Sequence, residues 1–128
     1  MVQWGDMDAL GHVNNVVYFR YFETGRVHYL EAVGASGFGE RSDVPVVAHI
    51  GLNFRRPAVY PATLDVGIRV PKLNNRSFTM ECAMFLQETD TLIADGTAAV
   101  VWIDKTTGKS LALPEAMRQA IIGLEQLA

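Results

Sequence analysis

Two carboxylates, a histidine and two amides lie close together near the start of the chain. They are Asp6, Asp8, His12, Asn14 and Asn15, and the segment that follows them has the pattern of a helix. The start of a helix offers unpaired backbone N–H groups and the positive end of the helix dipole, equivalent to roughly half a charge. Such a terminus can hold the oxygen of a polarised carbonyl, and a carboxylate beside it can attack that carbonyl or activate a water molecule. The segment therefore predicts a site for chemistry on a carbonyl group.

The same residues also allow purely structural interpretations. Asp6 and Asp8 could occupy turns, Asn14 could simply cap the helix, and His12 could be a satisfied loop histidine. An Asp-x-Asp pair also occurs in calcium loops, but those need further oxygen ligands and a distal glutamate, and none follows here. The three histidines of the chain show no ligand spacing, so we expect no metal. Gly11 would let the backbone and a ligand approach each other closely.

The segment from Asn15 to about Val33 has a helical pattern in which apolar residues point almost all round the axis. Its polar residues form one narrow stripe, so we expect other elements to cover the helix almost completely. Asn14 is a suitable N-cap, and Gly34 is a suitable residue just past the last turn. A short helix with Pro114 in its first turn ends the chain. The apolar stripe of this second helix consists of Met117, Ile121, Leu124 and Leu127.

Four segments alternate apolar and polar side chains with the two-residue period of a β-strand. They span residues 46–54, 64–70, 78–86 and 92–103. Short turns separate them, which favours antiparallel neighbours because parallel strands would need longer crossovers. The first strand should present one apolar face made of Val46, Ala48, Ile50, Leu52 and Phe54. Residues 1–4 could add a short strand before the loop that leads to Asn14. One sheet curled around the long helix would satisfy these patterns.

Composition sets the class of protein. The chain has 128 residues, of which 49% are hydrophobic and 20% charged, and it shows no repeat or linker, so we expect a single domain over residues 1–128. A formal net charge of −3 with scattered cations argues against a nucleic-acid surface. No stretch approaches the ~20 apolar residues of a membrane span, and residues 1–8 do not resemble a signal peptide, so we expect a cytoplasmic protein. The single cysteine, Cys82, should be a buried structural thiol.

A longer pattern joins the reactive segment to the helix. It reads Asp6-x-Asp8-x-x-Gly11-His12-Val13-Asn14-Asn15-x-x-Tyr18-x-x-Tyr21-x-Glu23-x-x-Arg26. This pattern resembles the signature of the 4-hydroxybenzoyl-CoA thioesterase group of hotdog proteins, and further landmarks of that family follow in the expected order. The resemblance implies an α+β hotdog fold, in which an antiparallel β-sheet wraps around a long central α-helix and a short C-terminal helix follows. It also implies an acyl-CoA thioesterase, which hydrolyses a fatty or aryl acyl-CoA to free acid and CoA.

The resemblance assigns catalytic roles to three positions. The acting carboxylate is the second aspartate, Asp8, which serves either as a nucleophile that forms a mixed anhydride or as a general base on water. The donor to the thioester oxygen is the backbone N–H at Asn15. His12 is a candidate helper, because the histidine takes part in catalysis in some acyl-carrier-protein relatives. Those relatives carry an asparagine where this chain has Leu10, so their mechanism does not transfer directly.

Candidate substrate-binding residues lie in two parts of the chain. Gly11 and Tyr18 belong to the motif. By the resemblance, Asn75, Arg76 and Ser77 meet the nucleotide or pantetheine of CoA, with Arg76 supplying charge and Ser77 a hydroxyl; a solvated turn residue is the alternative for Arg76. Other residues that could line an apolar acyl slot with Tyr18 are Phe19, Phe22, Met80 and Met84. We expect no cofactor, since CoA is part of the substrate.

Several charged residues have weaker functional interpretations. Glu23 and Arg26 lie three apart on the long helix, and a buried ion pair that positions the helix is the favoured role, with a catalytic Glu23 as the alternative. Arg55 and Arg56 are weaker candidates for holding CoA, because arginines at strand ends often serve interfaces. His49 lies in mid-strand on the face opposite Ile50, where we expect a structural or interface role.

The resemblance also bears on assembly and on alternative activities. Hotdog relatives pair their sheets edge to edge and form the site where two subunits meet, so we expect a homodimer and then a dimer of dimers. A hotdog dehydratase or hydratase acting on acyl thioesters is one alternative, although the His with Asp or Glu usual in those branches is not found here. A non-catalytic acyl-CoA-binding protein is the other. The sequence leaves open the acyl group and whether CoA or acyl-carrier protein carries it.

Overall fold

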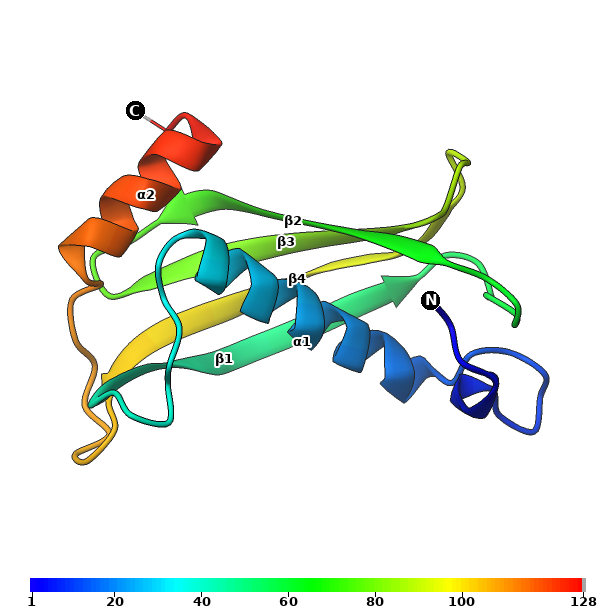
Figure 1. The fold of residues 1–128 in the computed structure, drawn as a ribbon, viewed down its shortest axis with the longest axis horizontal. Coiled ribbons are helices and arrows are strands. Elements are labelled where there is room, and N and C mark those ends of the chain that lie inside the picture. Colours follow the sequence, from blue (N-terminus) through cyan, green and yellow to red (C-terminus); the bar gives the residue numbers. More distant parts are fainter. Residues whose placement is uncertain (128) are drawn as a thin grey trace.

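One antiparallel sheet curls around one long helix (Figure 1). The computed structural model describes residues 1–127. The sheet has the strand order β1-β4-β3-β2 and all its neighbours are antiparallel. The elements in chain order are the 3₁₀ turn η1 (Trp4–Asp6), α1 (Asn15–Ala32), β1 (Asp43–Phe54), β2 (Leu64–Leu73), β3 (Ser77–Leu86), β4 (Leu92–Asp104) and α2 (Glu115–Glu125). This confirms the hotdog arrangement that the resemblance implies, including the short C-terminal helix.

The first residues do not form the short strand that the sequence suggested. Trp4 to Asp6 form a 3₁₀ turn instead, in which the Asp6 N–H donates to the Gln3 carbonyl. The Asp6 carboxylate accepts the Gln3 backbone N–H at 2.9 Å, and this local bond competes with strand pairing. The Val2 N–H donates to the Ala62 carbonyl, which ties this stretch to the connection that leads into β2.

The long helix begins and ends where the sequence predicted. The Asn14 side chain accepts the Val16 N–H at 2.9 Å, as an N-cap does. Gly34, two residues past the last helical residue, has φ of +86°, a left-handed conformation that favours glycine. The start of α1 is therefore fixed by its own cap, which matters because the reactive segment ends there.

The expectation that the helix would be almost completely covered is wrong for the single chain. Buried residues of α1 lie on one side only, and they are Tyr18, Phe22, Tyr29 and Leu30. Val16 and Val27 are 69% and 42% exposed. A four-stranded sheet covers one side of a helix, so the opposite side and the flank toward the sheet edge stay open. One protomer therefore leaves apolar helix surface exposed that the sequence pattern had assigned to the interior.

A bulge in β1 changes the face that its first half presents. The register of β1 against β4 shifts between Val47 and His49, so the alternation moves by one residue. After the bulge, Ile50, Leu52 and Phe54 lie on the helix side, as predicted. Before it, Val47 pairs with Val100, whose side chain is buried. The prediction that Val46 and Ala48 share the inner face is therefore wrong.

The sheet core follows the predicted alternation more closely in β3 and β4. Phe78, Met80, Cys82 and Met84 are all buried, which confirms the alternation predicted for the third strand. In α2, Met117 and Ile121 are buried as predicted, but Leu124 is 58% exposed. In the last turn of α2, Glu125 points inward instead of Leu124. The Glu125 carboxylate accepts hydrogen bonds from the Tyr29 hydroxyl at 2.7 Å and from the Val70 N–H at 2.9 Å.

Candidate active site

The reactive segment folds into a closed loop in front of α1. Met7 and Val13 form an isolated antiparallel bridge, and the Asp8 N–H donates to the His12 carbonyl at 2.9 Å. The Val13 N–H donates to the carbonyl of Ala58, in the connection that follows β1. The loop's own hydrogen bonds and the distant connection after β1 thus hold it in place at the start of the helix.

Asp6 anchors the loop to the helix, a role the sequence did not reveal. Its side chain is buried and accepts Arg20 Nη2 at 2.6 Å and the Tyr21 hydroxyl at 2.6 Å, besides the Gln3 N–H. Burial alone would raise the pKa of Asp6, but the hydrogen bonds from Tyr21, Gln3 and Arg20 outweigh it and hold this pKa below its usual value. Burial and the Asp6 carboxylate together raise the pKa of Tyr21 well above its ordinary value. All four groups are fixed, so Asp6 is a structural residue.

The backbone N–H of Asn15 has no acceptor within residues 1–127. It belongs to the first residue of α1, where the helix itself supplies no acceptor. The two following N–H groups are satisfied, because the Asn14 side chain accepts Val16 and the Asn14 carbonyl accepts Val17. Among the described residues none accepts from the Asn15 N–H. This donor is therefore available to an oxygen from outside the chain.

A cleft of about 420 Å³ opens at the start of α1. Three of the predicted site residues line it, and they are His12, Asn15 and Tyr18. The other side is formed by residues from the end of β1 and the turn after it, which are Phe54, Arg55, Arg56 and Pro57, and Val13 completes the lining. The structure therefore brings the candidate histidine and the candidate carbonyl donor to one cavity.

Tyr18 forms the apolar wall of the cleft. It is buried, its ring centroid lies 5.5 Å from that of Phe54, and its hydroxyl accepts the Ala58 N–H at 3.2 Å. Burial raises the pKa of the Tyr18 phenol, so this group stays protonated near neutral pH. A fixed, neutral tyrosine is suited to shaping a substrate pocket.

Asp8 lies in the same loop but does not line the cleft of the single chain. It is partly buried, and its Oδ1 accepts the Leu10 N–H at 2.9 Å, an Asx turn. Oδ2 accepts no hydrogen bond from any described residue. Gly11, at the tip of this turn, has φ of +83°, which is the left-handed conformation that glycine adopts most readily. Asp8 thus keeps one carboxylate oxygen open, whereas both oxygens of Asp6 are occupied.

The predicted CoA-binding residues lie at the opposite end of the sheet. Asn75 and Arg76 form the turn between β2 and β3, next to α2, while the reactive loop lies beyond the other ends of these strands (Figure 1). Arg76 donates to Ser110 Oγ at 3.0 Å, and Ser77 Oγ accepts from Asn74 at 3.2 Å. Within one chain the structure therefore does not bring this turn together with the cleft.

Two arginines that the sequence treated as weaker candidates do line the cleft. Arg55 donates to the Asp95 carboxylate through Nε at 3.2 Å and Nη2 at 3.3 Å. The Arg56 side chain is exposed and donates to no acceptor in the part of the chain that the structure describes. Its guanidinium is the cation at this cleft that is free to meet a phosphate. The signal in the sequence was the Arg-Arg-Pro that follows β1, but only the fold places it beside His12.

The expected ion pair between Glu23 and Arg26 does not form. Glu23 is exposed, and the guanidinium of Arg26 instead stacks on Phe22, 4.7 Å from the ring centroid. The interpretation as a buried pair within one helix is therefore wrong. Stacking on the fully buried Phe22 is the interaction that this chain offers Arg26.

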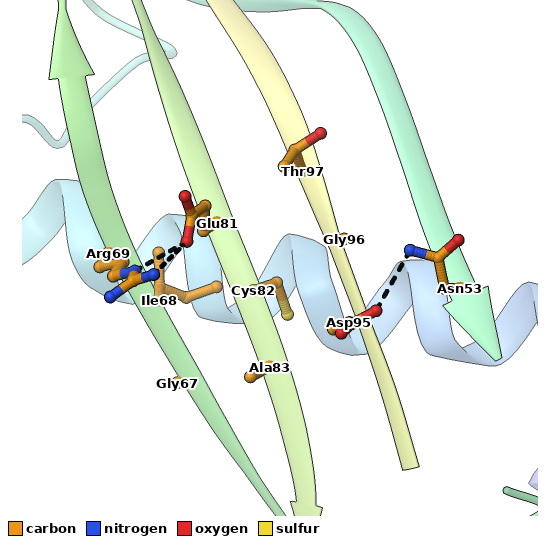
Figure 2. A pocket seen from close by; sticks show the side chains of 10 residues that line it. All are labelled: Asn53, Gly67, Ile68, Arg69, Glu81, Cys82, Ala83, Asp95, Gly96 and Thr97. Atoms are coloured by element: carbon orange, nitrogen blue, oxygen red, sulfur yellow. Dashed lines mark hydrogen bonds and ion pairs between the residues drawn. The ribbon is translucent and has the colours of Figure 1, made fainter. Parts of the chain in front are cut away.

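Two other hollows lie away from the helix start. One, of about 600 Å³, lies over the sheet, and Figure 2 shows its polar pairs, Arg69 with Glu81 and Asn53 with Asp95. Cys82 also lines it, and burial raises the pKa of this thiol to about 12, as befits a structural cysteine. The other, of about 440 Å³, is an apolar groove between α1 and β2. Among residues 1–127, no three His, Cys, Asp or Glu side chains are grouped so that they could hold a metal ion.

Comparisons of sequence and of structure both find thioesterases. The sequence model of the thioesterase-like superfamily matches residues 2–121. The long-chain acyl-CoA thioesterase FadM of Escherichia coli is 30% identical over 116 residues, which cover 90% of this chain and 88% of FadM. The crystal structure of PA5185 from Pseudomonas aeruginosa superposes with a TM-score of 0.90 at 30% identity, over 97% of this chain and 87% of that one. A thioesterase from Thermus thermophilus was solved with coenzyme A and zinc. It superposes with a TM-score of 0.85 at 31% identity, over 99% of this chain and 91% of that one.

No helix among the described residues is long and apolar enough to cross a membrane.

Proposed function

The chain belongs to the thioesterase-like superfamily and is a thioester hydrolase, and from this premise we propose that it hydrolyses acyl-CoA with Asp8 as the acting carboxylate. In the proposal, the thioester carbonyl oxygen accepts the backbone N–H of Asn15. The products are the free acid and CoA. A non-catalytic binder explains this arrangement less well, because it needs no carboxylate with an open oxygen. A hydratase would also polarise a thioester carbonyl, so the assay below has to separate it from a hydrolase.

The observation that carries the proposal is that no residue among 1–127 accepts the backbone N–H of Asn15, a residue that lines the cleft. A donor fixed by the helix and its cap needs no reorganisation when charge develops on the carbonyl oxygen. The positive end of the α1 dipole adds to this stabilisation. Removing one such donor from an enzyme costs about 100- to 1000-fold in kcat, so its placement is a main part of the proposed catalysis.

Two routes are compatible with Asp8. As a nucleophile, its free oxygen bonds to the carbonyl carbon, the C–S bond breaks and CoA leaves as the thiolate, and water then hydrolyses the mixed anhydride. As a general base, Asp8 takes a proton from water while the water oxygen attacks the same carbon. The tetrahedral intermediate then collapses, the C–S bond breaks and CoA leaves as the thiolate. In both routes the thiolate gains a proton, and His12 at the cleft is the candidate donor.

Carrier and assembly extend the proposal. The CoA found with the Thermus thermophilus relative and the long-chain substrate in the name of FadM support a long acyl-CoA, with Arg56 and the Asn75–Ser77 turn as phosphate or pantetheine contacts. The long edge strand β1 pairs with β4 on one side only, and such an edge favours pairing with a second chain. We therefore place a homodimer, and then a dimer of dimers, in the proposal, together with a cytoplasmic location and no cofactor.

The decisive experiment follows CoA release with a thiol reagent for the parent and for Asp8→Asn. We expect Asp8→Asn to lower kcat at least about 100-fold and to change KM little, because the carboxylate acts on the reacting atoms. The matched control is Asp90→Asn, in the exposed turn between β3 and β4, which should keep parental activity. If Asp8→Asn hydrolyses a long-chain acyl-CoA as fast as the parent, Asp8 is not the acting group. An enoyl-CoA assay by absorbance separates hydration from hydrolysis.

A further inference from the structure

The turn between β2 and β3 has few hydrogen bonds of its own. The Asn74 N–H donates to the Ser77 carbonyl at 2.8 Å, but the Ser77 N–H does not donate to the Asn74 carbonyl in return. Neither Asn75 nor Arg76 has a positive φ, whereas the favoured two-residue hairpin turns contain at least one, because positive φ matches the twist of the strands. The conformation of this turn therefore depends on contacts from outside the hairpin.

The helix α2 and the segment before it supply those contacts. α2 lies beside the turn at this end of the sheet (Figure 1). Arg118 of α2 donates through Nη2 to the Asn74 carbonyl at 2.5 Å and to the Asn75 carbonyl at 3.1 Å. The Asn75 carbonyl also accepts the Leu113 N–H at 3.0 Å. One guanidinium therefore binds the carbonyl to which Ser77 does not donate, together with the next carbonyl along the chain.

The segment before α2 also holds the side chain of Arg76. Arg76 Nη1 donates to Ser110 Oγ at 3.0 Å and to the Ser110 carbonyl at 3.4 Å, and the Arg76 carbonyl accepts the Trp102 N–H at 2.9 Å. The residue is exposed, and its Nε and Nη2 donate to no acceptor in the part of the chain that the structure describes. Arg76 is therefore held through one nitrogen, while its other donors are open to a phosphate.

Arg118 keeps its positive charge beside this turn. It is partly buried, and within residues 1–127 no carboxylate forms an ion pair with Arg118 or with Arg76. Hydrogen bonds to neutral carbonyl groups leave the charge of a guanidinium uncompensated, so two cations act at the turn together. A turn that is held by one cation and carries another is suited to an anionic ligand such as a phosphate.

We propose that Arg118 is a positioning residue for the CoA half of the substrate, which holds the turn of residues 74–76 so that Arg76 faces a phosphate of the nucleotide. The inference rests on the proposed function, which places this turn against CoA, and it adds the residue that sets the conformation of the turn. A donor that is held in place before binding loses less conformational entropy when the phosphate arrives. Arg118 therefore affects binding of the carrier and not cleavage of the thioester.

Two substrates that differ only in the nucleotide test this role. They are an acyl-CoA that the parent hydrolyses and the pantetheine thioester of the same acid, which has the same reacting bond but lacks the nucleotide phosphates. Arg118→Met keeps an apolar stem and removes the guanidinium. We expect it to raise KM for the acyl-CoA at least about fivefold and to keep kcat within about twofold, since binding lost equally from the ground and transition states changes KM alone. KM for the pantetheine thioester should stay within about twofold of the parental value.

A double variant distinguishes positioning from a separate phosphate contact. If Arg118 acts through the turn, its guanidinium has no donor left to present once Arg76→Ala has removed that side chain. Adding Arg118→Met to Arg76→Ala should therefore raise KM for the acyl-CoA by less than about twofold more. An independent contact would instead multiply the effects of the two single changes, and that result would overturn the inference.

Controls separate this role from folding. Gln119→Ala changes the next residue of α2, whose side chain donates to Glu115 of the same helix, and should leave both KM values unchanged. Parental kcat on the pantetheine thioester shows that the variant is folded and its site intact, and Arg118→Gln replaces Arg118→Met if the latter does not fold. An unchanged KM for the acyl-CoA, or an equal rise in KM for both substrates, would overturn the inference.

Failure of this inference is distinguishable from failure of the proposed function. If Arg76→Ala alone leaves KM for the acyl-CoA unchanged, the turn does not meet CoA, and the positioning role of Arg118 is wrong together with that contact. The hydrolysis itself is tested separately by CoA release from the parent and from Asp8→Asn.

Discussion

The two aspartates of the reactive segment lie two residues apart and have opposite roles. Asp6 is buried with both carboxylate oxygens occupied by an arginine, a tyrosine and a backbone N–H. Asp8 has one oxygen in an Asx turn and the other open. A carboxylate surrounded by donors is stabilised as an anion and is a poor nucleophile or base, whereas an open one can react. Environment therefore assigns structure to Asp6 and, in our proposal, chemistry to Asp8.

The anchoring role of Asp6 predicts a pH-dependent loss of stability. The folded-state pKa of Asp6 lies below its unfolded value near 3.8. Its contribution to stability is therefore complete above that value, and it is lost as the pH falls from there through the folded pKa. We expect Asp6→Asn to lower the free energy of unfolding at pH 7 by about 1–3 kcal/mol, the cost of losing hydrogen bonds to a charged acceptor.

Urea unfolding at several pH values checks this prediction. The gap between the parent and Asp6→Asn should be constant from pH 7 down to about pH 5 and should shrink below the unfolded pKa of aspartate. Asp65→Asn, at an exposed position of β2, should show no such gap. A gap of the same size at every pH would mean that the charge of Asp6 is not what holds the loop.

The elements differ in how far the sequence could predict them. The cap at Asn14 and the alternation from Phe78 to Met84 depend on neighbours in the chain, so the pattern predicted both correctly. The bulge near Ala48 depends on pairing with β4, and no local signal marked it. The same holds for the site: the motif indicated His12 and Asn15, but the contacts of Asp6 with residues 14 and 15 positions away appear only in the folded chain.

Gly96 in β4 lies so close to the neighbouring strand that we expect this position to accept only glycine. A Cβ built on Gly96 would overlap the carbonyl oxygen of Gly51 on β1, and β1 cannot move away without breaking its hydrogen bonds to β4. We expect Gly96→Ala to destabilise the fold by about 2 kcal/mol or more, or to lower the Tm by roughly 6–8 °C. Thermal unfolding by circular dichroism measures this.

Gly67→Ala is the matched control for that experiment. Its added Cβ would meet the Ala83 carbonyl at 3.8 Å, an ordinary contact, and Gly67 lies on β2 of the same sheet. It should change the Tm far less. Equal effects of the two substitutions would show that loss of glycine flexibility, and not overlap with Gly51, determines the result.

At the scale of the whole molecule, the proposed site residues are split between two ends of one sheet. The reactive loop lies at the start of α1, and the Arg76 turn lies at the far end of β2 (Figure 1). Ten strand residues separate the ends of β2, which is about 30 Å at the usual rise per residue. One CoA thioester held within one chain would have to span that sheet. A two-fold axis at the β1 edge reverses the second sheet, so it brings the partner's turn to the end where this chain keeps its loop.

This geometry predicts complementation between two defective variants. Asp8→Asn removes the proposed chemistry, and Arg76→Ala weakens the proposed CoA contact; a mixed dimer would carry one site built from the intact loop of one chain and the intact turn of the other. In a purified mixed dimer one of the two sites is therefore intact, whereas neither homodimer has an intact site. At acyl-CoA concentrations below the KM, we therefore expect co-expressed, doubly tagged mixed dimers to regain activity well above the mean of the two homodimers. Activity equal to that mean would show that each chain holds its own complete site, and that the Arg76 turn does not meet the substrate cleaved in the partner's cleft.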